Sequence, residues 1–353
     1  MISRSALLKT FAAVTGLLAG LLLAETACKI HDVYTARNRL RTVQRISRPS
    51  TIPGVRYELI PGVKSITPGS PYAIRVNNLG FRGPDVEPDK PPDRFRIVIL
   101  GDSISFGRMY DEQQIFASII QQQLDNVLPD QDIEIINASM SGRDTWETRA
   151  LLENRVVPLS PDLIVLQICL NDHIRLPPPD ESSKRGAFGE RPWYSYSSLL
   201  SLMDRRIVGF RKLHTRILDR FGIDAQSATD ALLNQTISPV RMIDVEPNWD
   251  SWSDELLAIN RIGREAGAQI LFVAFPIVYQ IKNNFREASP LLTELAAAHN
   301  IPLFEVVGLF GGNETKYLRD HTHLNRAGHR LVGTELAHTI GLFVREYEKP
   351  LDQ

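Results

Sequence analysis

Four short blocks of the chain carry residue types that together could perform acyl transfer at a serine. They contain Ser103, Gly142, Asn171 and the pair Asp320 and His323. A serine hydroxyl is a weak nucleophile at neutral pH, and it needs a neighbouring base such as histidine to take its proton. A carboxylate can hold that histidine in the right tautomer, and backbone or side-chain amides can stabilise the oxyanion that forms. These residue types therefore indicate nucleophilic catalysis.

A regular alternation of elements must position these blocks. Short apolar, β-branched runs predict strands at residues 95–100, 133–138, 162–167, 269–274 and 301–306. Amphipathic stretches predict helices at residues 112–128, 145–155, 253–266, 290–298 and 325–346. Near-continuous apolar strands alternating with such helices indicate a buried parallel sheet with helices on both faces. Ser103, Gly142 and Asn171 follow the first three strands, so all three lie at the carboxyl edge of the sheet.

The four blocks, in this order and each after its expected element, resemble those of the SGNH (GDSL-type) hydrolases, a family named after a Ser, a Gly, an Asn and a His. The resemblance covers roughly residues 95–345, without an inserted segment described below. It implies a flavodoxin-like three-layer α/β/α sandwich with a mainly parallel sheet, and ester hydrolysis or acyl transfer. Ser103 matches the family's nucleophile, Gly142 and Asn171 match its oxyanion-hole donors, and Asp320 and His323 match its D-x-x-H pair.

Two further stretches bear on the resemblance. Residues 77–83 (NNLGFRG) are similar to a stretch that often precedes the nucleophile block in bacterial membrane-anchored members. The third block reads Cys169-Leu170-Asn171-Asp172 where many members have Gly-x-Asn-Asp. The missing glycine affects the expected geometry of the loop but leaves the amide in place.

The expected roles follow from ordinary acid–base chemistry. His323 takes the proton of Ser103, and Asp320 fixes the imidazole tautomer. His321 is a rival base, but it lies one residue from Asp320 and should point elsewhere. The oxyanion would accept hydrogen bonds from the backbone N–H groups of Ser103 and Gly142 and from the side-chain amide of Asn171. Asp102 is expected to be structural, because a Gly-Asp-Ser turn commonly caps a helix.

The amino terminus predicts a membrane segment over residues 1–28. Arg4 and Lys9 precede an uncharged run from Thr10 to Ala24, and extending the run back to residue 6 gives nineteen residues. The next four residues (ETAC) supply neither a small-x-small cleavage site nor a lipobox, so an uncleaved signal-anchor is favoured over a cleaved signal peptide. Basic residues on both sides weaken the orientation signal, but export of the main domain, to the periplasm or the cell surface, is the expectation.

The rest of the chain divides into three parts. Residues 29–93 form a stalk and a turn-rich lead-in, residues 94–349 form the hydrolase domain, and residues 173–249 interrupt that domain as an insertion. An insertion at the carboxyl end of a strand overhangs the active-site edge, so it is either a cap or a surface excursion. In a cap, Trp193 and Tyr194 would contact substrate.

Composition excludes several classes of protein. The chain has 353 residues, of which 43% are apolar and 23% charged, so it is not disordered as a whole. A net charge of −1 disfavours nucleic-acid binding, and two cysteines exclude a disulfide framework or a zinc site of several thiolates. No cofactor or metal is expected, and no oligomeric state follows from the sequence.

The sequence therefore predicts a serine esterase that acts on an acylated small molecule or polysaccharide, with O-acetyl esters among the candidate substrates. An O-acyltransferase acting on an envelope or exported polysaccharide stays open as an alternative, because it would use the same acyl-enzyme. A non-catalytic protein that keeps the fold to bind glycan is the third hypothesis.

Overall fold

A five-stranded parallel sheet forms the centre of the unit built from residues 43–178 and 246–353. The computed structural model describes residues 4–42, 46–66, 72–169, 172, 248–276, 288–319 and 322–347. The strands are β5 (Arg94–Leu100), β6 (Asp132–Asn137), β7 (Leu163–Cys169), β8 (Gln269–Phe275) and β9 (Leu303–Glu305). They lie in the order β6-β5-β7-β8-β9 and coincide with the five predicted strands within a few residues. Because β5 has β6 on one side and β7 on the other, the order reverses at β5, where ligands commonly bind in open α/β sheets.

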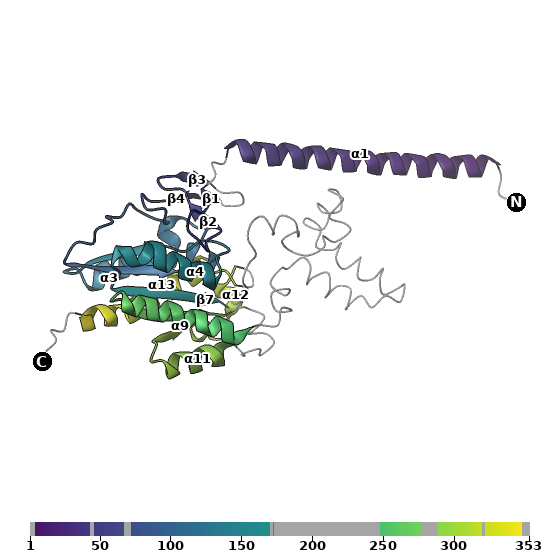
Figure 1. Cartoon of the computed structure of the whole chain (residues 1–353). Helices are drawn as coiled ribbons and strands as arrows, with labels where there is room; N and C mark the ends of the chain where they lie inside the picture. The colour runs from purple at the N-terminus through teal and green to yellow at the C-terminus, as the bar shows by residue number, and fades with distance from the viewer. Residues whose placement is uncertain are drawn as a thin grey trace, which may run out of the picture. The chain divides into compact units, whose positions relative to one another are not determined.

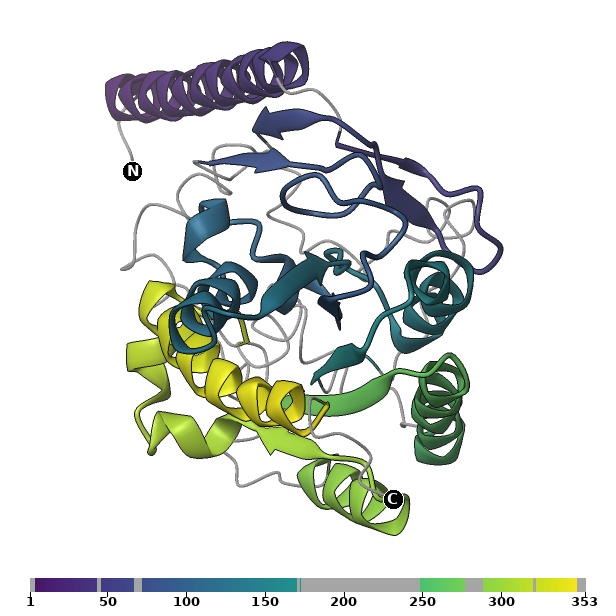
Figure 2. The ribbon, with the colours of Figure 1, turned by 90° about the vertical axis from the view of Figure 1, so that its left-hand side faces the viewer.

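Helices cover both faces of this sheet (Figures 1 and 2). They are α3 (Phe116–Val127) and α13 (Arg326–Tyr347) on one face, and α4 (Thr145–Leu151), α9 (Trp249–Glu265) and α11 (Ala288–Ala298) on the other. Successive side chains of a strand point to opposite faces. Accordingly Ile97 of β5 joins the core cluster that contains Phe116, and Val98 joins the cluster that contains Trp252. The predicted three-layer α/β/α arrangement is confirmed.

Two predicted helices are divided in the structure. Residues 145–155 form α4 and then most of a π-helix (Leu152–Val156). Residues 112–128 form the 3-10 helix η1 (Glu112–Gln114) and then α3, with Ile115 in an extended conformation between them. Asp111 and Gln114 form a capping box that closes η1 on itself. The extended Ile115 buries its side chain in the core, which a continuous helix would turn to another face.

The turn-rich lead-in packs onto the sheet unit. It forms two antiparallel hairpins, β1 (Ser47–Pro49) with β2 (Tyr57–Leu59) and β3 (Lys64–Ile66) with β4 (Ala73–Arg75). Val55, Phe81 and Val86 are buried in the same cluster as the strands of the central sheet. The lead-in therefore brings its polar residues close to the loops that follow those strands.

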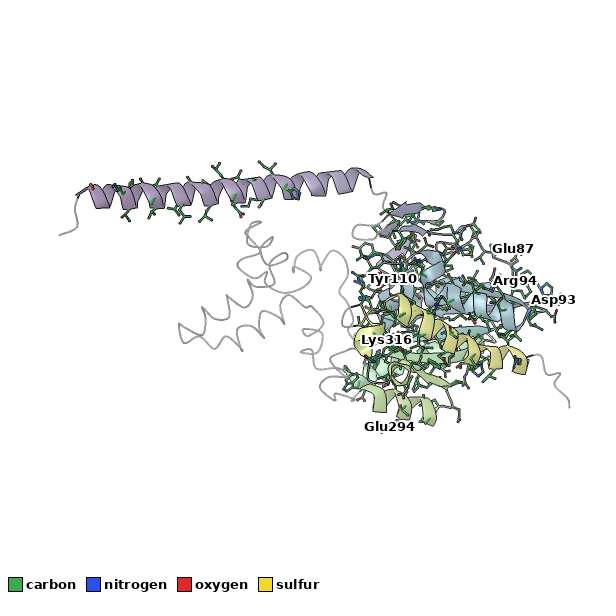
Figure 3. All side chains as sticks on the ribbon, turned by 180° about the vertical axis from the view of Figure 1, so that it is seen from behind. Glu87, Asp93, Arg94, Tyr110, Glu294 and Lys316 are labelled. Atoms are coloured by element: carbon green, nitrogen blue, oxygen red, sulfur yellow. The ribbon has the colours of Figure 1, made fainter. Side chains whose placement is uncertain are left out.

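Ion pairs stabilise the end of the sheet at which the strands begin. Arg94 donates to Asp132, and the fully buried Arg96 donates from Nε to Glu134 at 2.7 Å. Figure 3 shows Arg94 at one end of the unit and Tyr110 and Lys316 toward the other. Ion pairs thus hold one end of the sheet, and the loops that carry the predicted site leave from the opposite end.

The amino-terminal helix α1 (Arg4–Thr42) spans 39 residues. Its segment Lys9–His31 has a mean hydropathy of 1.8 over 23 residues. At 1.5 Å per residue this segment is about 35 Å long, enough to cross a hydrocarbon core of about 30 Å. The helix continues past residue 28 into the stretch expected to be a stalk. By length and composition it is a candidate membrane span.

The predicted insertion, with Trp193 and Tyr194, lies outside the described residues except for its last two positions, 248 and 249. Residue 249 already begins α9.

Candidate active site

Ser103 begins the short helix α2 (Ser103–Phe106) directly after β5. Asp102 caps this helix, since its carboxylate accepts a hydrogen bond from the Ile104 N–H at 2.8 Å. The side-chain oxygen of Gln167 accepts from the Asp102 N–H and from the Ser105 hydroxyl, both at 3.0 Å. These contacts fix the loop around Ser103 from both sides, and Asp102 has the structural role that its sequence context predicts.

His323 lies within hydrogen-bond distance of Ser103. Its Nε2 is 2.8 Å from Ser103 Oγ, although the two residues are 220 positions apart in the chain. The segment that carries His323 is closed at its base, because the Asn325 N–H donates to the Tyr317 carbonyl at 2.9 Å and the Arg319 N–H donates to the His323 carbonyl at 2.8 Å. The structure therefore brings the predicted nucleophile and the predicted base together.

Gly142 occupies a tight turn after β6. The Arg143 N–H donates to the Met140 carbonyl at 3.3 Å, and Gly142 has a φ of 78°. In the four-residue turn from Met140 to Arg143, Gly142 is the third residue. A turn with positive φ at its third residue alone is a type II turn, and this position favours glycine. The Met140 N–H also donates to the Gly101 carbonyl at 3.2 Å, which ties this turn to the loop of the nucleophile. Among the described residues, none accepts a hydrogen bond from the Gly142 N–H.

Asp320 and Asn171, the other two predicted site residues, lie outside the described residues. Asp172, which follows Asn171, is described and buried. Its Oδ2 accepts from the Cys169 N–H at 2.7 Å, and its Oδ1 is buried with no described hydrogen-bond partner. Burial raises the pKa of the Asp172 carboxyl well above its ordinary value, and the negative charge of Asp102 raises it further.

The backbone of Asp172 is held by a chain of buried hydrogen bonds. The Thr145 hydroxyl donates to the Asp172 carbonyl, and the Trp252 indole N–H donates to the Thr145 hydroxyl, each at 2.9 Å. Helices α4 and α9 thereby fix the end of the third block.

Cys169, which stands where many family members have glycine, fits into this site. Its Sγ lies 3.4 Å from the hydroxyl oxygen of Thr322, the residue before His323. Both side chains are buried. The cysteine thus joins β7 to the segment that carries the predicted base.

Arg56 is a residue of the site that the sequence did not indicate. Its Nη2 donates to the Gly142 carbonyl at 2.5 Å and to Glu147 Oε2 at 2.7 Å. Its backbone N–H donates to Glu147 Oε1 at 2.6 Å. Glu147 also belongs to the capping box that begins α4 with Asp144. A single arginine in a stretch rich in proline and glycine gives no local signal of such a contact.

Arg82 is the residue through which the stretch at residues 77–83 contacts the helix of the nucleophile. Its guanidinium donates to the carbonyl of Phe106, the last residue of α2, and to the Tyr110 carbonyl at 2.7 Å. Burial lowers the pKa of Arg82 to about 10. The stretch therefore supports the carboxyl end of α2, the helix that Ser103 begins. The sequence pattern singled out residues 77–83 but did not indicate this contact.

Within the described part of the chain, no group of three or more His, Cys, Asp and Glu side chains could hold a metal ion.

Comparison with known families accounts for the arrangement. A family model described as the GDSL-like Lipase/Acylhydrolase family matches residues 99–331, which is more than half of the chain. The chain belongs to the GDSL-like lipase/acylhydrolase family. The matched range of this GDSL-like protein contains all five predicted site residues, from Ser103 to His323.

Individual relatives of this GDSL-like protein match over parts of its length. An arylesterase from Vibrio mimicus is 31% identical over 84 residues, which are 24% of this chain and 41% of the relative, so less than half of that relative is matched. The crystal structure of TesA shares 16% identity, covers 69% of this chain and 97% of its own, and gives a TM-score of 0.41. A catalytic mutant of Axe2, an acetylxylan esterase from Geobacillus stearothermophilus, shares 13% identity, covers 70% and 94%, and gives a TM-score of 0.44.

Proposed function

We propose that this GDSL-like protein is a serine esterase that hydrolyses acyl esters through an acyl-enzyme on Ser103. The 2.8 Å contact between His323 Nε2 and Ser103 Oγ is the observation that carries the proposal. A nucleophile and a base in this contact, beside a turn whose Gly142 N–H donates to no described residue, form the arrangement that acyl transfer needs. Membership of an acylhydrolase family supports the same reaction class.

In the first step Ser103 Oγ attacks the ester carbonyl carbon, and its proton passes to His323 Nε2. Asp320 would accept a hydrogen bond from Nδ1 and so keep Nε2 free as the acceptor. The oxyanion would accept hydrogen bonds from the Ser103 and Gly142 N–H groups and from the Asn171 amide. The C–O bond then breaks, and the alcohol leaves with the proton from His323.

In the second step water attacks the acyl-enzyme. His323 takes a proton from the water, the tetrahedral intermediate collapses, and the carboxylic acid leaves as Ser103 regains its proton. Each proton is returned within the cycle, so the reaction consumes only the ester and one water.

Labelling with a fluorophosphonate probe tests the proposal, together with hydrolysis of p-nitrophenyl acetate. The wild-type protein should be labelled and active, and Ser103→Ala should lose both properties. His323→Ala should lose activity to a similar extent, and the double variant should lose little more, because the two residues act as a unit. His299→Ala, which changes an exposed histidine at the end of α11, is the matched control and should be active. Labelling that persists in Ser103→Ala would exclude Ser103 as the nucleophile.

We also propose that α1 anchors the protein in a membrane, uncleaved, with the sheet unit outside the cytoplasm. The 23-residue apolar segment and the basic residues Arg4 and Lys9 ahead of it support an exported signal-anchor. Protease added to intact spheroplasts should digest the sheet unit. Protection of that unit until the membrane is lysed would reverse the orientation.

A further inference from the structure

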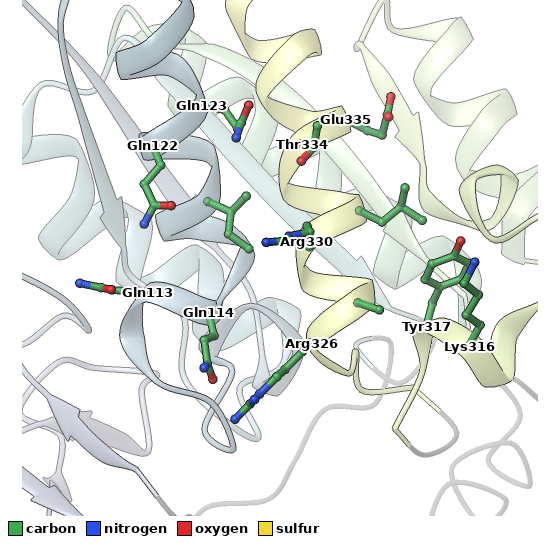
Figure 4. Close-up of a pocket in the computed structure, with 13 residues that line it drawn as sticks. Gln113, Gln114, Gln122, Gln123, Lys316, Tyr317, Arg326, Arg330, Thr334 and Glu335 are labelled. Carbon is green, nitrogen blue, oxygen red and sulfur yellow. The ribbon is translucent and has the colours of Figure 1, made fainter.

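A groove with a volume of about 950 Å³ extends from η1 and α3 across the exposed face of α13 to α12 (Glu314–Tyr317) (Figure 4). The glutamines lie on one side of α13, and Lys316 and Tyr317 lie on the other. Its polar lining consists mainly of glutamine amides and of basic side chains. The basic side chains are Lys316, Arg326 and Arg330, and the glutamines are Gln113, Gln114, Gln122 and Gln123.

The groove is positively charged although the chain as a whole is not. Three cations face one carboxylate, Glu335, whereas the net charge of the chain is −1. None of the three cations forms an ion pair with a described carboxylate; Arg326 instead contacts the ring and hydroxyl of Tyr72, and Lys316 lies over the ring of Tyr317. Cations that no described carboxylate neutralises attract an anionic ligand.

The glutamines narrow the chemistry of that ligand. A glutamine amide offers two donors and an acceptor. A phosphate group that carries its full charge only accepts hydrogen bonds, so it would not pair with the amide oxygens of Gln113, Gln122 and Gln123. The Gln114 oxygen already accepts from the Asp111 N–H. Sugar hydroxyls both donate and accept, and sugar carboxylates pair with arginine. Four amides beside three cations therefore match a ligand that carries hydroxyls and carboxylates together.

The groove begins beside the proposed active site. Tyr317 and Arg326 both line it, and the segment that carries His323 runs between these two residues. Arg326 follows His323 by three positions, so their Cα atoms lie within about 11 Å of one another. On the other side of α13, Gln113 and Gln114 follow α2, which Ser103 begins. Arg326 and Arg330 are four residues apart on α13, about 6 Å along the helix axis. Arg326 and Arg330 thus lead away from His323 along α13.

We infer that this groove binds an acidic glycan, a chain of sugars that carry carboxylates, as the alcohol part of the ester. The inference rests on the proposed function only for the reaction, and glycan binding stands on the groove alone. An anionic membrane surface is the other polyanion that an anchored protein meets. The phosphate groups of such a surface would use only the donors of the glutamine amides, whereas sugar hydroxyls use donors and acceptors alike, so the amides favour the glycan.

Calorimetric titration of the full-length protein in detergent tests the inference. The Ser103→Ala background prevents turnover, and the probe is a short oligogalacturonide. Binding is expected, and it should weaken as salt is added. Replacing both Arg326 and Arg330 by glutamine should weaken binding about tenfold or more, because charge-assisted pairs are lost. Glu335→Gln should strengthen binding. Arg261→Gln, an exposed arginine on α9, is the matched control and should bind as the parent does.

Several outcomes would overturn the inference. A neutral xylo-oligosaccharide of the same length that binds equally well would remove the role of charge. Unchanged binding in the double arginine variant would place the ligand elsewhere. Binding of inorganic phosphate or of phosphatidylglycerol vesicles, but not of the oligogalacturonide, would assign the cations to phosphate or lipid. The fluorophosphonate experiment fails independently of this one, since titration of Ser103→Ala needs no catalysis.

Discussion

Arg56 fixes the backbone carbonyl of Gly142, 86 positions away in the chain, through a hydrogen bond of 2.5 Å from Nη2. The same nitrogen also contacts the buried carboxylate of Glu147 at 2.7 Å, so the guanidinium cannot turn freely. Gly142 has a left-handed φ of 78°, a conformation that glycine leaves easily. Because the Gly142 carbonyl is held in place, the backbone of Gly142 has less freedom to rotate. The direction of the Gly142 N–H is restricted as a result. Arg56 is therefore a positioning residue for the proposed oxyanion hole.

Replacing Arg56 by alanine should lower kcat and leave KM nearly unchanged. We expect a loss of about tenfold in kcat, smaller than the roughly hundredfold loss that follows removal of a whole oxyanion donor. Steady-state kinetics on p-nitrophenyl acetate measures both constants. Arg56→Lys, which keeps a donor, should recover part of the loss. Arg48→Ala removes a neighbouring arginine that pairs with Glu58 and should be active. A rise in KM alone, or an equal loss in Arg48→Ala, would show that the lead-in only supports the fold.

Asp172→Asn should stabilise the protein at neutral pH. Burial raises the pKa of this carboxyl above its ordinary value, so the unfolded chain loses the proton first as pH rises. The free energy of unfolding therefore has its full value, as far as this carboxyl is concerned, below about pH 4, the pKa of the unfolded state. It falls as the pH rises above that value. The neutral amide removes this loss while it can still accept from the Cys169 N–H. Thermal unfolding should show no difference from wild type near pH 4 and a Tm higher by a few degrees at pH 7. A lower Tm at both pH values would contradict the argument.

His329 should make the protein sensitive to acid. This buried residue of α13 accepts a hydrogen bond at Nδ1 from the Phe116 N–H, and burial, aided by the charge of Arg82, lowers its pKa to about 3. Since the unfolded histidine titrates near 6.5, the unfolded state binds more protons below that pH. The free energy of unfolding should fall by up to about 1.4 kcal/mol per pH unit from pH 6.5 toward pH 3. Urea unfolding at pH 7 and pH 5 measures this slope, and His329→Gln should reduce it. An unchanged slope in the variant would assign acid sensitivity to other groups.

A chain that begins at Tyr34 should leave the membrane fraction and stay active. It lacks the 23-residue apolar segment of α1, and all five predicted site residues lie beyond residue 100. Ultracentrifugation and p-nitrophenyl acetate hydrolysis check the two parts of this expectation. If the protein expressed from residue 1 is recovered from the soluble fraction with a shortened amino terminus, the segment is a cleaved signal peptide.

Replacing Trp193 and Tyr194 with alanine tests the predicted cap. If the insertion contacts substrate, KM for an acetylated polysaccharide should rise several-fold, while turnover of p-nitrophenyl acetate should change little, because Ser103 and His323 are held by the core of the sheet unit. Aromatic side chains commonly contribute large contact areas in such recognition. Equal losses on both substrates would assign the segment a structural role.

The sequence determined the parts of this protein that depend on local pattern. Apolar runs of strand length, alternating with amphipathic helical stretches, predicted all five strands of the central sheet. Because parallel strands end at one edge, the positions of Ser103 and Gly142 followed from the strands that precede them. Resemblance to a family then paired Ser103 with His323, a contact that no local pattern contains.

Only the tertiary structure decided which residues outside the motifs support them. Arg56 reaches Gly142, and Arg82 reaches the end of α2, from a turn-rich segment that has no periodicity to interpret. The contact between Cys169 and Thr322 joins residues 153 positions apart. Such contacts depend on how the lead-in and the loops pack against the finished sheet, and packing brings together side chains whose spacing in the sequence carries no information about their distance in space.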